Sequence, residues 1–213
     1  MPSVRISDTD TAATDAAIVD AVAALRAHGH AVVRDLFAPA LLSRLAAQAQ
    51  SAASSARLRP AGVGASARRA PALRGDSIAW LEPAASAAEA DFLTVCERLR
   101  ERLNRELLLG LTGFEAHFAL YPPGAAYARH RDRLRDGDAR VLSLACYLDA
   151  DWSAADGGQL RLYADDGVLD VLPCRGTCVL FLSAATEHEV LPPRRPRHSI
   201  AAWFRQRRLP GAR

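Results

Sequence analysis

The stretch that decides the fold is GGQLRLYADDGVLDVLP, residues 157–173. Two alternating apolar runs flank an Asp-Gly pair, a pattern typical of an antiparallel β-hairpin. Similar short runs surround it: FEAHFALY (114–121), VLSLACYL (141–148), TCVLFLS (177–183) and HSIAAWFRQ (198–206). Turn residues bound each run and no helical pattern separates them. The sequence therefore predicts a β-sandwich or jelly-roll barrel rather than a parallel sheet.

The first half of the chain has a different texture. Apolar residues recur at helical spacing over residues 11–28, 39–56 and 86–108, whereas residues 30–37 and 76–82 are strand-like. We expect an α+β fold, with a double-stranded β-helix (jelly-roll, cupin-like) core at residues 113–206 that is buttressed by a helical support with some sheet at residues 11–112. Gly, Pro and Ser without periodicity predict a mobile loop at about 57–73. No internal repeat or linker divides residues 1–213, so we expect one domain with a basic tail at 207–213.

Composition limits the possible classes of protein. The 213 residues are 50% hydrophobic and 24% charged, which is typical of a soluble globular chain. No apolar run approaches the roughly 20 residues that a membrane span needs. The start, MPSVRISDTDTAAT, lacks the basic and apolar regions of a signal peptide. These features predict a cytoplasmic protein without a membrane partner.

Charge and cysteine usage add little chemistry. The net charge is only +3 and every basic side chain other than His is Arg, which indicates codon bias rather than a nucleic-acid footprint. A solvated tail is the favoured interpretation of the Arg-rich C-terminal end, with phosphate contact as the alternative. Four cysteines form no CxxC pairs, so reduced structural thiols are expected: Cys96, Cys146, Cys174 and Cys178.

A possible metal site lies in YARHRD, residues 127–132. Residues i and i+2 of an extended chain point to one side, so His130 and Asp132 can converge. Two His and one carboxylate bind iron and leave positions open for a co-substrate and oxygen. His188 comes 58 residues after His130 and could supply the second His from another strand. Alone, the HxD pair is a weak signal.

Arg197 strengthens the metal hypothesis. On an extended strand it shares a face with Ser199, Ala201 and Trp203. An Arg inside an otherwise apolar barrel is costly unless it meets an anion, and its planar guanidinium suits a carboxylate. Together with the three possible ligands it suggests a 2-oxoacid with two carboxylates, bound through both ends. The alternative is that Arg197 pairs with an Asp of this chain.

With these residues in this order, the chain resembles the Fe(II)/2-oxoglutarate-dependent oxygenases, and within them the prolyl hydroxylases of the hypoxia-inducible-factor type. The HxD…H…R spacing is common to the superfamily, whereas RGDxIxWLE and YLxxDW are narrower signals for the prolyl-hydroxylase branch. The similarity extends over HGHAVVRDLF (28–37), RGDSIAWLE (74–82), YPPGAAYARHRD (121–132), RVLSLACYLDADW (140–152), GGQLRLY (157–163) and HEVLPPRRPRHSIAAWF (188–204).

The resemblance implies roles for eleven residues. Iron would be held by the catalytic triad of His130, Asp132 and His188. 2-Oxoglutarate would be bound by Arg197, Tyr147, Tyr121 and Leu160, and the substrate by Arg140, Asp76, Trp80 and Trp203. It also implies O2 as co-substrate, ascorbate as a reductant, succinate and CO2 as products, and a mobile finger at about 57–73 that closes over the substrate.

Plainer interpretations stay open for several of these residues. Tyr147 and Trp203 could be core aromatics, and Tyr121 could cap the turn at Pro122-Pro123. Asp76 and Arg140 could form a structural ion pair. His117 alternates onto the face of Tyr121, but a hydrogen-bonded core His is favoured over a residue of the site, and we assign His198 no role.

The expected function is hydroxylation of a prolyl residue in a cytoplasmic protein, with elongation factor Tu as a candidate. Alternatives are a hydroxylase of free proline or another small molecule, a nucleic-acid demethylase, and a non-catalytic binding domain. Demethylases usually carry a second Arg six residues after the co-substrate Arg, where this chain has Trp203. The intact triad and Arg197 argue against loss of catalysis. The oligomeric state stays open.

Overall fold

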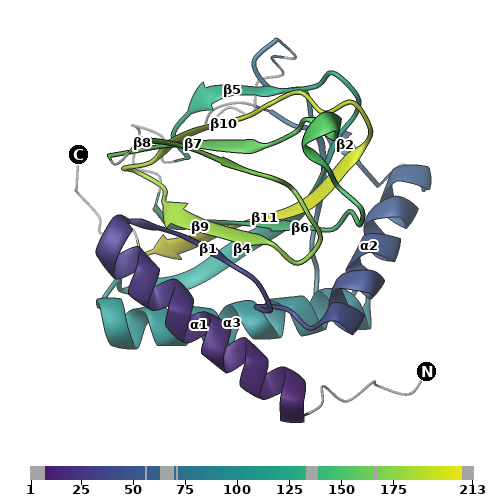
Figure 1. The fold of residues 1–213 in the computed structure, drawn as a ribbon. Helices are drawn as coiled ribbons and strands as arrows, with labels where there is room; N and C mark the ends of the chain where they lie inside the picture. Colours follow the sequence, from purple (N-terminus) through teal and green to yellow (C-terminus); the bar gives the residue numbers. More distant parts are fainter. Residues whose placement is uncertain are drawn as a thin grey trace.

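Two antiparallel β-sheets lie face to face, and helices cover the outer face of the larger sheet (Figure 1). This arrangement comes from a computed structural model that describes residues 8–55, 57–62, 70, 72–132, 139–165 and 167–207. The two stacked sheets confirm the double-stranded β-helix predicted from the short alternating runs, and the space between them holds the candidate site.

The larger sheet has seven strands and the smaller has four. In spatial order the larger sheet consists of β1 (His30–Val33), β9 (Cys178–Leu182), β6 (Arg140–Tyr147), β11 (Arg197–Gln206), β4 (Leu111–Tyr121), β3 (Ser77–Trp80) and β2 (Arg59–Pro60). The smaller consists of β5 (Tyr127–His130), β10 (Glu187–Val190), β7 (Leu160–Ala164) and β8 (Gly167–Val171). Ala164 lies opposite Gly167, which confirms the predicted hairpin.

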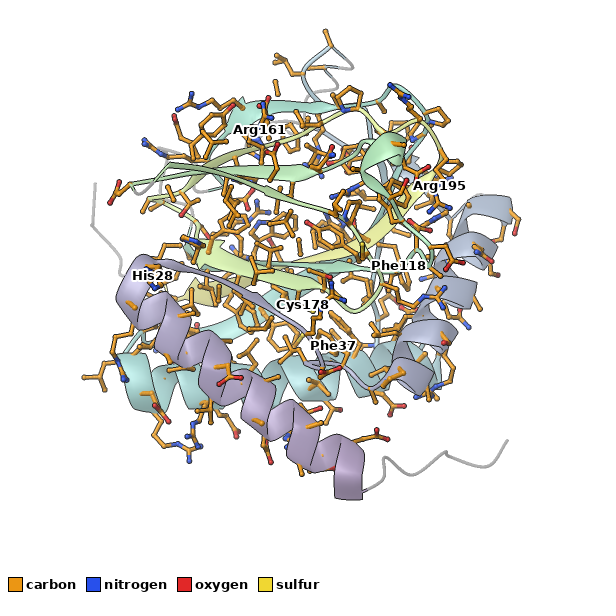
Figure 2. All side chains as sticks on the ribbon, in the orientation of Figure 1. His28, Phe37, Phe118, Arg161, Cys178 and Arg195 are labelled. Carbon is orange, nitrogen blue, oxygen red and sulfur yellow. The ribbon has the colours of Figure 1, made fainter. Side chains whose placement is uncertain are left out.

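The three predicted helices are present as α1 (Asp8–His28), α2 (Pro39–Ser54) and α3 (Ala87–Leu107), and a short 3₁₀ helix, η1 (Ala154–Asp156), precedes β7. Helix α3 begins where the Ser86 hydroxyl accepts a hydrogen bond from the Glu89 backbone N–H, an N-cap that satisfies one free donor of the first turn. Phe37 stacks on Phe92 with ring centroids 4.5 Å apart. One apolar cluster joins the helices to the large sheet and includes Phe37, Phe118 and Cys178 (Figure 2).

A second apolar cluster lies around Tyr121, Tyr147, Leu160 and Phe181, residues that come from both sheets. Strands of the two sheets therefore share a core, and polar side chains that point between the sheets are shielded from water. Any such group needs a partner or a ligand.

Strands from the N-terminal half of the chain join the larger sheet. Strand β1 pairs with β9 at one edge of the large sheet, and β3 pairs with β4 towards the other edge. Strand β2 lies inside the segment expected to be a mobile finger loop, and residues 63–69 and 71 of that segment lie outside the described residues. Of the expected basic tail, only Arg207 belongs to the described part of the chain. No described helix has both the length and the apolar character needed to cross a membrane.

Candidate active site

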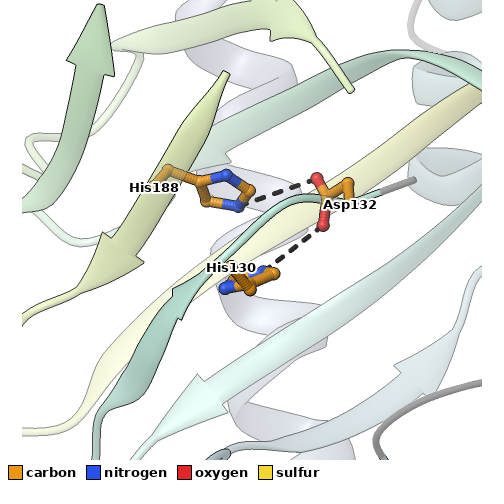
Figure 3. Close-up of side chains that lie close together, drawn as sticks. All are labelled: His130, Asp132 and His188. Carbon is orange, nitrogen blue, oxygen red and sulfur yellow. Dashed lines mark ion pairs between the residues drawn. The ribbon is translucent and has the colours of Figure 1, made fainter. Parts of the chain in front are cut away.

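The side chains of His130, Asp132 and His188 point toward one another beside strands β5 and β10 of the small sheet (Figure 3). His130 ends β5, Asp132 follows two residues later, and His188 lies on β10 directly opposite His130. One potential ligand atom from each side chain lies within 4.8 Å of the others. The sequence prediction that these three residues converge is therefore met by the structure.

Both imidazoles are oriented by backbone carbonyls. The Nδ1 atom of His130 lies 2.8 Å from the carbonyl oxygen of Ala128, and that of His188 lies 3.4 Å from the carbonyl oxygen of Thr186. An N–H at Nδ1 leaves Nε2 with a free lone pair, the form in which His binds metals. The Nε2 atoms lie 3.5 Å and 3.7 Å from the two Asp132 carboxylate oxygens. His130 Nε2 is buried and has no hydrogen-bond partner among the described residues, which fits a ligand atom.

The electrostatics of the triad favour a divalent cation. Burial opposes ionisation of Asp132, but the neighbouring His188, the contact with His130 and a hydrogen bond from Ser143 together hold the pKa of its carboxyl well below the usual range. Burial is the main cause that lowers the pKa of His188 to about 4, and the neighbouring His130 acts in the same direction. At neutral pH the site therefore offers a carboxylate and an unprotonated imidazole, the states that metal binding requires.

Arg197 projects between the sheets and is only 2% exposed. Its Nε donates to the carbonyl oxygen of Gly158 at 2.8 Å, and one terminal nitrogen donates to the Ser199 hydroxyl at 3.3 Å. No carboxylate among the described residues lies within ion-pair distance, so the alternative that Arg197 pairs with an Asp of this chain is wrong for that part of the chain. A buried guanidinium without a carboxylate partner indicates a site for an anionic ligand.

Two phenols lie beside this guanidinium. The centre of the Arg197 guanidinium is 4.9 Å from the Tyr147 ring centroid and 5.2 Å from that of Tyr121. Burial raises the pKa of both hydroxyls, so each stays protonated and can donate a hydrogen bond. The Tyr147 hydroxyl is buried and has no partner among the described residues. A buried guanidinium beside two hydroxyl donors, one of them unsatisfied, suits a carboxylate ligand.

These groups surround a pocket of about 530 Å³, which includes its opening to solvent. Eight of the eleven residues expected in the site line this pocket, whereas Tyr147 is fully buried beside Arg197 and is not among the lining residues. The eight are His130, Asp132, His188, Arg197, Tyr121, Leu160, Asp76 and Trp203. The pocket thus joins the possible metal ligands of the small sheet to the possible anion-binding groups of the large sheet.

A neighbouring groove, about 910 Å³ with its opening to solvent included, contains the last two expected residues, Arg140 and Trp80. Trp203, His117 and Arg74 line both the groove and the pocket, so the two spaces adjoin. The charged side chains along the groove are all arginines: Arg57, Arg59, Arg74 and Arg140.

The interpretation of Asp76 and Arg140 as an ion pair is wrong. Asp76 instead accepts two hydrogen bonds from Arg74, at 2.7 Å and 3.0 Å. Arg140 donates to Glu115 at 2.8 Å, and its guanidinium lies 3.9 Å from the Trp203 ring centroid. Arg74 and Arg140 are therefore held by different carboxylates, and Arg205 shares that of Glu115 with Arg140.

His117 lies where the pocket meets the groove. Its ring is 5.2 Å from Trp80 and 5.1 Å from Trp203, measured between centroids, and Nδ1 approaches the carbonyl oxygen of Phe118 at 3.0 Å. Burial, with a smaller effect from the Arg74 charge, lowers the pKa of His117 to about 4. Both interpretations thus hold: it is a hydrogen-bonded, neutral core His that also lines the site.

Sequence reasoning gave no role to several residues of the site. The Tyr127 ring stacks on that of His130 with centroids 3.6 Å apart, and the Arg74 guanidinium lies 4.8 Å from the Tyr127 centroid. Ser143 contacts Asp132 directly. Arg74 opens the quoted RGD segment and Tyr127 opens YARHRD, so position within those motifs was the available signal. Ser143 had none, because one Ser in an apolar strand is common.

Comparison with known proteins identifies the family. The sequence model of the 2OG-Fe(II) oxygenase superfamily matches residues 116–205. Egl nine homolog 1 of Rattus norvegicus is 30% identical over 146 residues, which cover 62% of this chain and 41% of that protein. This chain thus spans about two fifths of the length of that curated relative.

Solved structures extend the similarity to the whole fold. A prolyl-4-hydroxylase of Pseudomonas putida is 41% identical with a TM-score of 0.83, covering 89% of this chain and 99% of that one. A prolyl hydroxylase of Trichoplax adhaerens, solved with a peptide of the hypoxia-inducible-factor oxygen degradation domain, shares the fold with a TM-score of 0.85 at 24% identity, over 96% of this chain and 95% of that one. The chain belongs to the 2OG-Fe(II) oxygenase superfamily, on its prolyl-hydroxylase branch.

Proposed function

We propose that this protein is an Fe(II)- and 2-oxoglutarate-dependent dioxygenase that hydroxylates a prolyl residue of a protein or peptide. The observation that carries the proposal is the pairing, in one pocket, of a two-His, one-carboxylate cluster with a buried Arg that has no carboxylate partner among the described residues. A metal triad with open positions and a carboxylate-binding Arg are what a chelating 2-oxoacid requires.

Each group has a distinct part in this proposal. His130, Asp132 and His188 hold Fe(II). Arg197 binds the carboxylate of 2-oxoglutarate remote from the metal, with hydrogen bonds from the hydroxyls of Tyr147 and Tyr121. When bound, iron and 2-oxoglutarate supply the oxidation of a C–H bond by O2, with succinate and CO2 as products and ascorbate as a reductant. The protein excludes water and fixes the relative positions of the reactants.

A peptide substrate is supported by the groove beside the pocket. Trp80 is 46% exposed there and lies edge-on to His117, while Trp203 lies deeper and is buried. Aromatic faces suit a proline ring, and the guanidinium N–H groups suit backbone carbonyls. A free amino acid would leave this groove unused. The Pseudomonas putida relative, a prolyl-4-hydroxylase by name, supports the same class of substrate.

The proposal is tested by mass spectrometry of candidate proteins for one added oxygen atom on Pro. The purified enzyme is incubated with Fe(II), 2-oxoglutarate, ascorbate and air, first with bacterial elongation factor Tu and then with fractionated cytoplasmic proteins. We expect hydroxyproline in a peptide only with active enzyme, and not with His188→Ala. Consumption of 2-oxoglutarate that responds to free proline but to no protein or peptide would instead establish a small-molecule hydroxylase.

A further inference from the structure

Two buried serines form a hydrogen-bonded chain that ends on Asp132. Ser143 on β6 is 2% exposed and its hydroxyl donates to the Asp132 Oδ2 atom at 2.6 Å. Ser183, directly after β9, is fully buried, and its hydroxyl oxygen lies 2.8 Å from that of Ser143. Both serines belong to the large-sheet side, whereas Asp132 follows β5 of the small sheet.

The direction of this chain follows from the protons available. An ionised carboxylate can only accept hydrogen bonds, and each serine hydroxyl carries a single proton. The Ser143 proton is therefore used on Asp132. The Ser183 hydroxyl must then be the donor to the Ser143 oxygen. The order Ser183 to Ser143 to Asp132 leaves one arrangement of these hydroxyl protons.

The two hydrogen-bonded serines orient the side chain of Asp132, as backbone carbonyls orient the two imidazoles. His130 and His188 are each oriented by a carbonyl two residues earlier in their own strand segment. Asp132 is the member of the triad held by a side chain from the other sheet. With Oδ2 held by Ser143, the carboxylate cannot rotate freely, and Oδ1 faces His130 Nε2 at 3.5 Å.

We propose that Ser143 is the positioning residue for the metal-binding carboxylate of Asp132, and that Ser183 fixes the hydroxyl of Ser143. The inference rests on the proposed function, because it takes Asp132 as a metal ligand. Hydrogen bonds to metal ligands from outside the coordination sphere typically contribute about 10- to 100-fold in metal affinity or activity. The carboxylate is thus oriented before the metal binds.

The test measures metal binding rather than turnover. The metal-free protein is titrated with Co(II) under anaerobic conditions, and its affinity and visible spectrum are recorded. We expect Ser143→Ala to bind Co(II) roughly 10-fold more weakly or worse, with an altered spectrum. Ser143→Thr keeps the hydroxyl and should stay close to wild type. The Co(II) affinity of Ser183→Ala should lie between those of Ser143→Ala and wild type, because this variant loosens Ser143 without removing the donor to Asp132.

Ser199→Ala is the matched control. Ser199 is a buried Ser that lines the same pocket, but its hydroxyl contacts Arg197 instead of Asp132. Its removal should leave the Co(II) affinity unchanged. Thermal unfolding of each metal-free variant checks that all of them fold.

The outcomes separate this inference from the function on which it rests. Wild-type affinity and spectrum in Ser143→Ala would overturn the positioning role, and so would an equal loss in Ser143→Thr and Ser143→Ala. If the wild-type protein binds neither Co(II) nor Fe(II), the triad is no metal site, and the proposed function fails together with the inference.

Discussion

His130 on β5 lies directly opposite His188 on β10, with ring centroids 4.2 Å apart. Residues that face each other across antiparallel strands project to the same side of the sheet, so this register sends both imidazoles towards Asp132. A shift of one residue in the register of β5 against β10 would turn one ring to the opposite face of the sheet, and the three side chains would no longer meet. The proposed metal site therefore depends on the pairing of two strands of four residues each.

Removal of one of these rings should abolish iron binding. Anaerobic addition of Fe(II) and 2-oxoglutarate to the wild-type protein should give a visible charge-transfer band, and His188→Ala should lose it. His198→Ala is the control, because His198 contacts Asp149 at 2.8 Å, outside the pocket. A band that persists in His188→Ala would remove His188 from the metal site.

Arg197→Ala should raise the concentration of 2-oxoglutarate that the enzyme requires. Truncation of a buried charge that binds an opposite charge costs about 2 kcal/mol or more, which corresponds to roughly 30-fold or more in affinity. Arg195→Ala provides the comparison: its guanidinium stacks on Trp152 at 4.4 Å and contacts no residue proposed to bind 2-oxoglutarate. An unchanged requirement in Arg197→Ala contradicts the role given to that residue.

Gly158→Ala should affect the same ligand indirectly. Gly158 has φ +71°, and a Cβ there would lie 3.2 Å from the Arg197 Cδ and 3.0 Å from the Pro193 Cβ. The added methyl group strains the backbone and displaces the guanidinium, so 2-oxoglutarate should bind more weakly while Co(II) affinity is kept. Gly167→Ala is the control for strain alone, because that glycine has φ +130° and nothing within 4 Å of the added atom. Equal 2-oxoglutarate affinity in the two variants would refute the contact.

His117 should make the stability of the metal-free protein depend on pH. Its folded pKa of about 4 lies below the ordinary 6.5, so between these values the unfolded chain holds a proton that the folded protein does not. The free energy of unfolding therefore falls as the pH falls through this window, by up to about 1.4 kcal/mol per pH unit. His117→Phe keeps a ring between the tryptophans and lacks the titrating group. Urea unfolding at pH 7 and pH 5 should show wild type losing roughly 2 kcal/mol more than this variant; an equal loss contradicts the prediction.

Trp80 should matter for peptide binding and not for the co-substrate. Because Trp80 is a half-exposed aromatic in the groove, Trp80→Ala should raise the KM for a proline-containing peptide roughly 10-fold, the size expected for loss of an aromatic anchor. The 2-oxoglutarate requirement should stay unchanged. Leu108→Ala, at an exposed position that lines neither the pocket nor the groove, is the control. A peptide KM that ignores Trp80 would place the substrate elsewhere.

The strands and helices that the sequence predicted are those whose pattern is local. The hairpin of β7 and β8 and the long helix α3 follow from apolar periodicity and turn residues. Strands β5 and β10 were expected only as extended chain around the histidines, because YARH and EHEV contain too few apolar residues to form a pattern. The pairing of β10 with β5 on one side and with β7 on the other creates them. The strands that pair with β1 and β3 could not be predicted from the sequence either, since packing decides which edge of a sheet a short strand joins.

In the site, the residues with a motif could be predicted and the residues that depend on tertiary neighbours could not. The convergence of His130, Asp132 and His188 was predictable because alternation and strand return are general rules. The ion pair of Asp76 was misjudged because Arg74, two residues earlier, reaches the carboxylate first. Ser143 acquires its importance only when the second sheet brings Asp132 against it.

The division of the site between the two sheets has a mechanical consequence. The proposed metal ligands belong to the strands or loops of the small sheet, whereas Arg197, Tyr121 and Tyr147 belong to the large sheet. A bound 2-oxoglutarate that contacts both sets of residues would link the small sheet to the large sheet. Its binding free energy then adds to the free energy of unfolding, because the two sheets separate when the protein unfolds. In the proposed enzyme, resistance to unfolding should thus track the supply of a central metabolite, whether or not any substrate is being hydroxylated.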